Sequence, residues 1–214
     1  MAQAAARAGR SGHSVTLLAV TKAQPPPVVR AAAGCGLKDF GESYLQEALG
    51  KLDALQDCAL TWHFVGRLQS NKTRAVAERF AWVHALDRLK IAQRLSEQRP
   101  PHAPPLNVCL QVKVGAELSK GGVAAAELPE LARAVAGLPR LKLRGLMCIP
   151  PEETEYERQR AWFRELRRLC RALNDAGAGL DTLSMGMTGD FEAAIEEGAT
   201  IVRVGTALFG PRPG

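Results

Sequence analysis

The chain has 214 residues, of which 46% are hydrophobic, so it is long enough to bury one continuous core. Its formal charge of +6 favours anionic partners, but a charge this modest does not by itself identify nucleic acid or a membrane as a ligand. The five cysteines lie far apart and form no Cys-x-x-Cys pair or Cys/His cluster, which indicates a reducing compartment and no structural metal.

The first 14 residues are rich in alanine, arginine and serine, as in a transit peptide. The apolar run that follows, VTLLAV at 15–20, is too short for a signal-peptide core or a membrane span. This run predicts the first strand of the fold. We therefore expect a cytoplasmic protein.

Short apolar or β-branched runs recur along the whole chain, separated by longer amphipathic stretches. They predict eight strands, at 14–22, 39–42, 63–66, 82–86, 107–114, 144–150, 180–186 and 201–206. The proline-dense segment 99–106 is short enough to be the loop that enters the fifth strand rather than a domain linker.

Helical spacing of apolar residues predicts helices between the strands. They cover 44–55, a segment capped by Ser70 with Val76 and Phe80 inward, a segment capped by Asp87 with Ile91 and Leu95 inward, and a segment with Pro129 in its first turn and Leu131, Val135 and Leu138 inward. Nearly all-apolar strands alternating with helices favour one domain, 1–214, built as a (β/α)₈ barrel of the TIM type. An open doubly wound sheet is the alternative.

The segment 157–173 predicts a long helix with six arginines. Trp162, Leu166, Leu169 and Leu173 fall on one stripe, while Arg160, Arg164, Arg167 and Arg171 fall opposite. This pattern is typical of an outer helix of a barrel with a solvated basic face. We therefore expect neither nucleic acid nor a membrane as a partner.

In a parallel barrel the loops that follow the strands meet at one face, so residues just past the strands are expected to converge there. Those residues are Lys22, Glu42, Ser43, the segment 66–72, Asp87, Ser119, Lys120, Met147, Ser184, Gly186, Met187, Arg203, Gly205 and Thr206.

The last two strands are followed by SMGMTGD and VGTALFG, which place glycines and hydroxyl groups where backbone N–H groups are unpaired. Such loops surround phosphate groups, and phosphate sites after strands seven and eight are common in this fold. The alternative is that the glycines only permit tight turns.

Lys22 is a lone lysine at the end of the first strand, directly before AQPPP. A lysine there is either solvated or paired with a carboxylate, or it supplies an amine for a Schiff base. An amine facing a phosphate site would suit a molecule with an aldehyde and a phosphate, and pyridoxal 5′-phosphate (PLP) is such a molecule.

Seven motifs between about 15 and 210 resemble the PLP homeostasis proteins, the YggS/PROSC family: LLAVTK, FGESYLQE, HFVGRLQSNK, VHALDRL, RGLMCIP, LSMGMTGDFEAAI and VRVGTALFG. The resemblance implies the type III PLP fold, a barrel similar to the N-terminal domain of alanine racemase without its C-terminal β-domain. It also implies intracellular vitamin B6 homeostasis, in which PLP is held and buffered or delivered without established turnover.

The same resemblance assigns roles to individual residues. Lys22 would form the internal aldimine, Arg203 would face the pyridine nitrogen, and Ser184, Gly205 and Thr206 would hold the phosphate. Ser43, Met187 and Lys120 are further candidates near the cofactor, with Lys120 a second amine that could assist release. Ser43 stands where many members have asparagine, and Lys113 departs from an asparagine common in the fifth strand.

The alternatives are a PLP-dependent amino-acid racemase or another type III PLP enzyme, and a Schiff-base aldolase of sugar phosphates. Racemization needs a second base, which this fold takes from a tyrosine of the β-domain, and Tyr44 is better explained by helix packing. As partners of a carrier we expect apo PLP-dependent enzymes and free amino acids. We expect a monomer or a weak homodimer.

Overall fold

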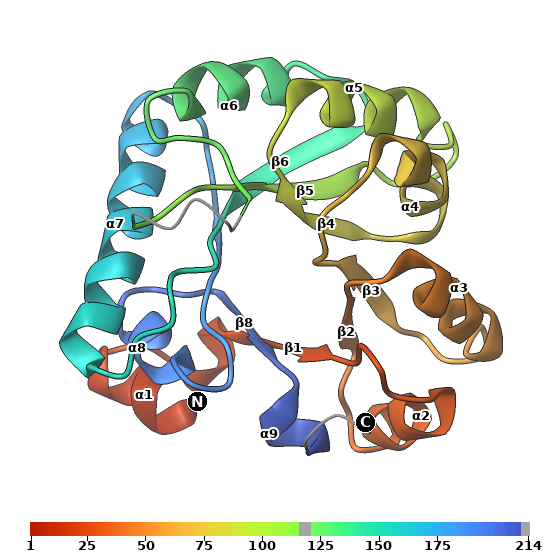
Figure 1. The fold of residues 1–214 in the computed structure, drawn as a ribbon, viewed down its shortest axis with the longest axis horizontal. Helices are drawn as coiled ribbons and strands as arrows, with labels where there is room; N and C mark the ends of the chain where they lie inside the picture. The colour runs from red at the N-terminus through yellow and green to blue at the C-terminus, as the bar shows by residue number, and fades with distance from the viewer. Residues whose placement is uncertain (116–120, 211–214) are drawn as a thin grey trace.

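The computed structural model describes residues 1–115 and 121–210. Within this part, eight parallel strands form a closed barrel in chain order, and the last strand pairs back onto the first (Figure 1). They are β1 (Thr16–Val20), β2 (Asp39–Glu42), β3 (Thr61–Phe64), β4 (Trp82–Leu86), β5 (Leu106–Gln111), β6 (Leu141–Met147), β7 (Thr182–Ser184) and β8 (Ile201–Val204). The barrel prediction is confirmed, and the open doubly wound sheet is excluded because no strand of this barrel is left as an edge.

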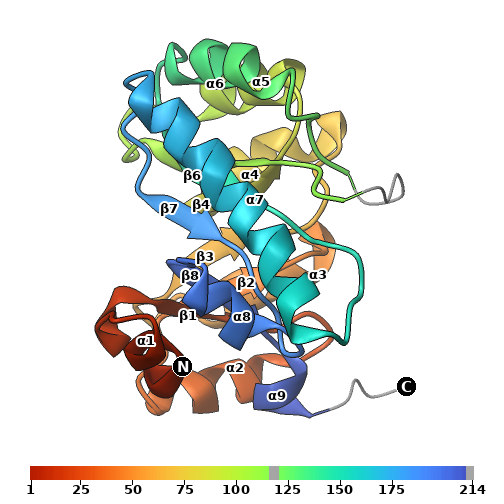
Figure 2. The same ribbon diagram turned by 90° about the vertical axis from the view of Figure 1, so that its left-hand side faces the viewer.

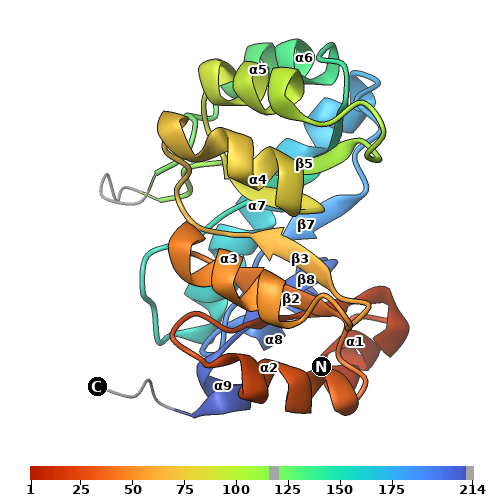
Figure 3. The same ribbon diagram turned by 90° about the vertical axis from the view of Figure 1, so that its right-hand side faces the viewer.

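Helices lie outside the strands, as the two opposite side views in Figures 2 and 3 show. In the described residues they are α1 (Ala2–Arg7), α2 (Pro26–Gly34), α3 (Leu45–Ala54), α4 (Thr73–Arg79), α5 (Leu89–Gln98), α6 (Leu128–Ala136), α7 (Tyr156–Asp175), α8 (Phe191–Glu196) and α9 (Thr206–Phe209). None of these helices has the length and apolar character that crossing a bilayer requires.

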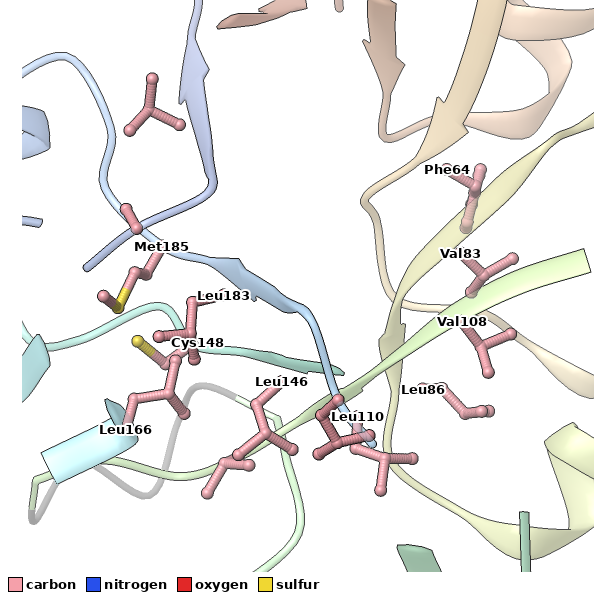
Figure 4. Close-up of a cluster of buried hydrophobic side chains, with 14 of the residues drawn as sticks. Phe64, Val83, Leu86, Val108, Leu110, Leu146, Cys148, Leu166, Leu183 and Met185 are labelled. Carbon is pink, nitrogen blue, oxygen red and sulfur yellow. The ribbon is translucent and has the colours of Figure 1, made fainter. Parts of the chain in front are cut away.

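The main hydrophobic core combines strand and helix side chains, and Figure 4 shows part of it. Val83 of β4 and Val108 of β5 belong to this cluster together with Leu166 of α7, and all three are fully buried. Strands covered by helices on one face and by the barrel interior on the other need apolar residues at most positions. This is why the strands could be recognised as short apolar runs.

Both predicted helix caps are wrong in detail. Helix α5 begins at Leu89 after an extended Arg88, and the carboxylate of Asp87 instead accepts a 2.9 Å hydrogen bond from Arg88 Nε. Ser70 opens a short 3₁₀ turn, Ser70–Lys72, and α4 begins only at Thr73. The spacing of apolar residues correctly predicted which segments are helical. The residue at which each of these two helices begins depends on local contacts that the spacing does not show.

The basic face of α7 is not simply solvated. Arg160, Arg164 and Arg167 all pair with the carboxylate of Glu197, which follows α8 and is only 1% exposed, at distances of 2.8–3.0 Å. The opposite stripe is buried as predicted at Leu166 and neighbouring turns. The arginines therefore help to fasten α7 to α8.

Candidate functional site

A cavity of about 270 Å³ opens at the carboxyl ends of the strands. It is lined by residues from the loops after β1, β2, β3, β6, β7 and β8: Val20, Lys22, Gln24, Ser43, Val65, Ile149, Met187, Thr188, Gly189, Arg203, Gly205, Thr206, Phe209 and Gly210. Residues from across the whole sequence thus meet at one barrel mouth, as the topology predicts.

Lys22 is half-buried and lies two residues past the end of β1. The chain turns sharply after it, because Ala23 has a φ of 63°, in the left-handed region that residues with a Cβ rarely adopt. The backbone N–H of Ala23 donates a 2.7 Å hydrogen bond to Glu47 Oε1 on α3. Backbone strain of this kind is tolerated where the surrounding structure holds the backbone in place. The strained turn at Ala23 therefore sets the position from which the side chain of Lys22 extends.

A buried ion pair lies beneath this turn. Lys51 Nζ donates to Glu42 Oε1 at 2.7 Å and to the carbonyl oxygen of Thr21 at 2.5 Å, and it also contacts Glu47. Thr21 Oγ1 donates to the same Glu42 oxygen at 2.6 Å. Burial raises the pKa of the Glu42 carboxyl, and the hydrogen bonds from Lys51 and Thr21 oppose this shift. The ammonium group of Lys51 on α3 therefore holds the end of β1 through the carbonyl oxygen of Thr21 and the end of β2 through Glu42.

The loop between β7 and α8 forms another wall of the cavity. Gly186 has a φ of 93°, and a Cβ at this position would lie 2.6 Å from the Cβ of Ala194, so no other residue fits without displacement. The next N–H, of Met187, donates to Asp190 Oδ1 at 2.5 Å. These contacts leave Thr188 and Gly189 exposed at the cavity.

Donors without acceptors gather along this wall and the next one. Within the described residues, the backbone N–H groups of Thr188, Gly189, Gly205 and Thr206 donate no hydrogen bond, and neither do the two threonine hydroxyls. All four residues line the cavity. Unpaired N–H groups beside hydroxyls form the kind of concave site that binds phosphate.

Arg203 lines the cavity and is only 5% exposed. Its Nη1 donates to the carbonyl oxygen and to Oγ of Ser184, at 2.6 and 2.9 Å, and its Nη2 donates to the carbonyl oxygen of Cys148 at 2.7 Å. Nε–H donates to no described residue. Burial lowers the pKa of the guanidinium, but arginine starts so high that it stays charged.

Ser184 lies elsewhere than its expected phosphate role requires. It is fully buried, it does not line the cavity, and its hydroxyl contacts His84 Nδ1 at 2.7 Å as well as Arg203. The reason is the pleat of β7, which directs this side chain into the barrel. Its geometry supports a role in holding Arg203.

The structure brings most of the predicted site residues together. Those that line the one cavity are Lys22, Ser43, Met187, Arg203, Gly205 and Thr206. Lys113 is exposed and does not line it, and Lys120 lies outside the described residues, as does Ser119.

Other residues at or near the cavity are not among those predicted from the sequence. Thr188 belongs to the SMGMTGD motif, and its position next to a glycine is the signal that indicates it. His63 and His84, which lie inside the barrel, were signalled only by being polar residues within apolar strands.

The cavity fits a small phosphorylated aldehyde such as PLP. Lys22 supplies an amine and Arg203 supplies a guanidinium donor. Thr188, Gly189, Gly205 and Thr206 supply donors that bond to no other described residue and can bind an anion. Lys22 follows β1, Thr188 and Gly189 follow β7, and Arg203, Gly205 and Thr206 belong to β8 and the residues directly after it.

Comparison with known proteins gives a consistent result. The family model for the alanine racemase N-terminal domain matches residues 2–213. The chain is 61% identical to a pyridoxal phosphate homeostasis protein of Pseudomonas aeruginosa over 210 residues, which cover 98% of this chain and 90% of the relative. It is 51% identical to the protein of the same name from Escherichia coli over 212 residues, which cover 98% of this chain and 91% of the relative.

Among solved structures, PipY of Synechococcus elongatus with PLP bound superposes with a TM-score of 0.87 at 37% identity, covering 98% of this chain and 99% of that one. The resemblance read from the seven sequence motifs is thus confirmed along nearly the whole chain.

Proposed function

Because the chain belongs to the pyridoxal phosphate homeostasis protein family, we propose that it binds PLP in the cavity at the barrel mouth and takes part in intracellular PLP homeostasis by buffering or delivering the cofactor. One observation carries this proposal: Lys22 and Arg203 line a single cavity together with Gly205 and Thr206, whose N–H groups bond to no other described residue. The PLP-bound structure of PipY, a relative that aligns over nearly its whole length, supports the choice of ligand.

The residues of this chain divide the work of binding. Lys22 Nζ supplies the amine that binds the cofactor covalently through its aldehyde. The N–H groups and hydroxyls of Thr188, Gly189, Gly205 and Thr206 bind the phosphate. Arg203 donates Nε–H toward the pyridine nitrogen, and Ser184 orients Arg203 from below.

PLP supplies, when bound, an aldehyde that captures amines and a ring that withdraws electrons. Burial lowers the pKa of Arg203, but an arginine side chain stays protonated in proteins, so Arg203 keeps its own proton. Arg203 would therefore donate a hydrogen bond to the ring nitrogen while keeping its proton, which would limit electron withdrawal by the ring. We expect this site to hold PLP rather than to turn over amino acids at ordinary enzymatic rates.

Further parts of the proposal concern the setting of the protein. Residues 1–214 would act as one PLP-binding domain, in the cytoplasm, where the five free thiols of this chain would stay reduced. Apo PLP-dependent enzymes would receive the cofactor, and free amino acids would release it by competing with Lys22. The protein would act as a monomer or a weak homodimer.

The test combines a transfer assay and a turnover assay on PLP-loaded protein. Loaded protein is expected to activate an apo PLP-dependent enzyme, whereas a chiral assay on common amino acids should detect little racemization. Sustained racemization or decarboxylation at about 1 s⁻¹ or faster would restore the type III PLP enzyme alternative. Protein that gains no visible absorbance on addition of PLP would contradict the proposal itself.

A further inference from the structure

A continuous line of hydrogen-bonding side chains runs through the barrel interior beneath the cavity. Ser184 Oγ lies 2.7 Å from His84 Nδ1, His84 Nε2 lies 2.9 Å from His63 Nδ1, and His63 Nε2 lies 3.0 Å from Asp39 Oδ1. Arg203 Nη1 joins the line by its 2.9 Å bond to Ser184 Oγ. Both histidines are at most 1% exposed.

The two ends of this line lie at opposite ends of the barrel. Arg203 lines the cavity at the carboxyl ends of the strands, whereas Asp39 is the first residue of β2, at the amino ends. The side chain of Asp39 is 31% exposed, so its carboxylate is in contact with solvent. The line therefore joins a cation at the cofactor site to an anion at the far surface.

Only one arrangement of protons satisfies every group. The guanidinium of Arg203 can only donate, so Ser184 Oγ accepts from it and keeps its own proton for His84 Nδ1. His84 then carries its proton on Nε2 and donates to His63 Nδ1, and His63 donates from Nε2 to Asp39. The reverse order would leave the buried serine proton without an acceptor and set His63 Nε2 against the carboxylate, acceptor against acceptor.

Both imidazoles must be neutral in this arrangement, since each uses one nitrogen as an acceptor. The surroundings favour that state. Burial lowers the pKa of His63, opposed by Asp39, and burial lowers the pKa of His84 further, helped by His63 and Arg203.

The indole ring of Trp82 stacks on the imidazole of His63, with ring centroids 5.4 Å apart. The guanidinium carbon of Arg144 lies 4.9 Å from the centroid of the Trp82 ring. A further cation in the interior would repel Arg203 at one end and face Arg144 at the other.

We propose that Asp39, His63, His84 and Ser184 are positioning residues that form a one-directional hydrogen-bond relay, which fixes the Arg203 guanidinium beneath the cofactor and couples it to the charge of Asp39. This relay rests on the proposed function, in which PLP would be the ligand and Arg203 would face its ring nitrogen. Two carbonyl oxygens, of Ser184 and Cys148, also hold Arg203. The relay adds the third contact and sets the direction of polarisation.

The first measurement needs no cofactor. Nitrogen-15 NMR of the imidazoles in apo protein should show His63 and His84 neutral, each with its proton on Nε2, between about pH 5.5 and 8. Either imidazole carrying its proton on Nδ1, or charged at about pH 6, would overturn the relay. This result is independent of whether PLP binds, so failure of the relay and failure of the proposed function are distinguishable.

The second measurement is the apparent PLP dissociation constant together with the absorbance maximum of the bound cofactor. Ser184→Ala should raise the dissociation constant about tenfold and shift the maximum, since it removes one charge-assisted hydrogen bond to Arg203. Asp39→Asn should raise it about threefold, because the contact persists while the charge is lost. Thr182→Val, a hydroxyl deletion two residues earlier on β7 and outside the relay, is the matched control and should change neither.

His84 separates positioning from packing. His84→Leu should behave like Ser184→Ala, whereas His84→Asn should restore much of the affinity and the absorbance maximum, because its amide oxygen can accept the Ser184 proton near the position of Nδ1. Circular dichroism identifies any variant that fails to fold, and in that case Asp39→Asn, at a partly exposed position, gives the result. An unchanged maximum and affinity in folded Ser184→Ala and Asp39→Asn would overturn the proposal.

Discussion

Replacing Lys51 by methionine should show how much the buried ion pair near the end of β1 contributes to the free energy of unfolding. Glu42 is fully buried and Lys51 is 3% exposed, so the substitution leaves a carboxylate without its cation inside the protein. The carboxyl would then take up a proton, and doing so at about pH 7 from its usual pKa of 4.5 costs about 3.4 kcal/mol. With the lost bond to the Thr21 carbonyl, we expect a loss of about 3–5 kcal/mol in the free energy of unfolding.

The destabilisation caused by Lys51→Met should increase with pH. Burial already raises the pKa of Glu42, and removing Lys51 raises it further. A carboxyl with a raised pKa in the folded state does not oppose folding below its unfolded pKa, and stability is lost as the pH rises toward the folded value. The destabilisation of Lys51→Met relative to the parent should therefore stay nearly constant up to the folded-state pKa of Glu42 in the parent, and above that pKa it should grow by up to about 1.4 kcal/mol per pH unit.

Urea unfolding of the parent and of Lys51→Met at several pH values measures this directly. Adding Glu42→Gln to Lys51→Met should abolish the extra pH dependence, because the titrating group is gone. Arg30→Met, which breaks an exposed pair with Asp57, is the control and should cost less than about 1 kcal/mol. A loss below about 1 kcal/mol for Lys51→Met at pH 7, or a loss that does not grow with pH, would refute the reasoning.

Two further substitutions test the walls of the cavity. Thr206→Val keeps the backbone donors but removes one hydroxyl, so PLP affinity should fall by about 1–2 kcal/mol with the circular dichroism spectrum intact, and unchanged affinity in an equilibrium titration would count against the phosphate assignment. Gly186→Ala should lower the free energy of unfolding by about 2–4 kcal/mol, because the new Cβ would lie 2.6 Å from the Cβ of Ala194 and the backbone has a φ of 93°. Gly50→Ala, in open space on α3, is the control and should be neutral or stabilising. Equal effects of the two substitutions in thermal unfolding would show that crowding does not explain the glycine at 186.

Much of this architecture was predictable because a parallel barrel repeats one physical requirement. Each strand is buried on both faces, so runs such as 82–86 stand out as apolar, and strand order then places Lys22 beside Gly205 and Thr206 without knowledge of any contact. The motif resemblance added the identity of the ligand, which composition and spacing alone left open.

The remaining errors come from features that a linear pattern does not contain. Whether Ser184 or Thr188 faces the cavity depends on the pleat and the turn at Gly186, a matter of orientation rather than composition. The pairing of His63 with His84 arises from adjacent strands 21 residues apart. Likewise, the sequence pattern of α7 indicates a solvated arginine face, because it does not show that Glu197, directly after α8, pairs with these arginines.

The most direct test of the central proposal is the site of covalent attachment. PLP-loaded protein is reduced with borohydride, digested, and mapped by mass spectrometry, together with the variants Lys22→Ala and Lys90→Ala, the latter replacing an exposed lysine of α5 outside the cavity. We expect a single modified peptide containing Lys22, no visible absorbance band in Lys22→Ala, and an unchanged band in Lys90→Ala. A reducible adduct of unchanged occupancy on another lysine in Lys22→Ala would contradict it.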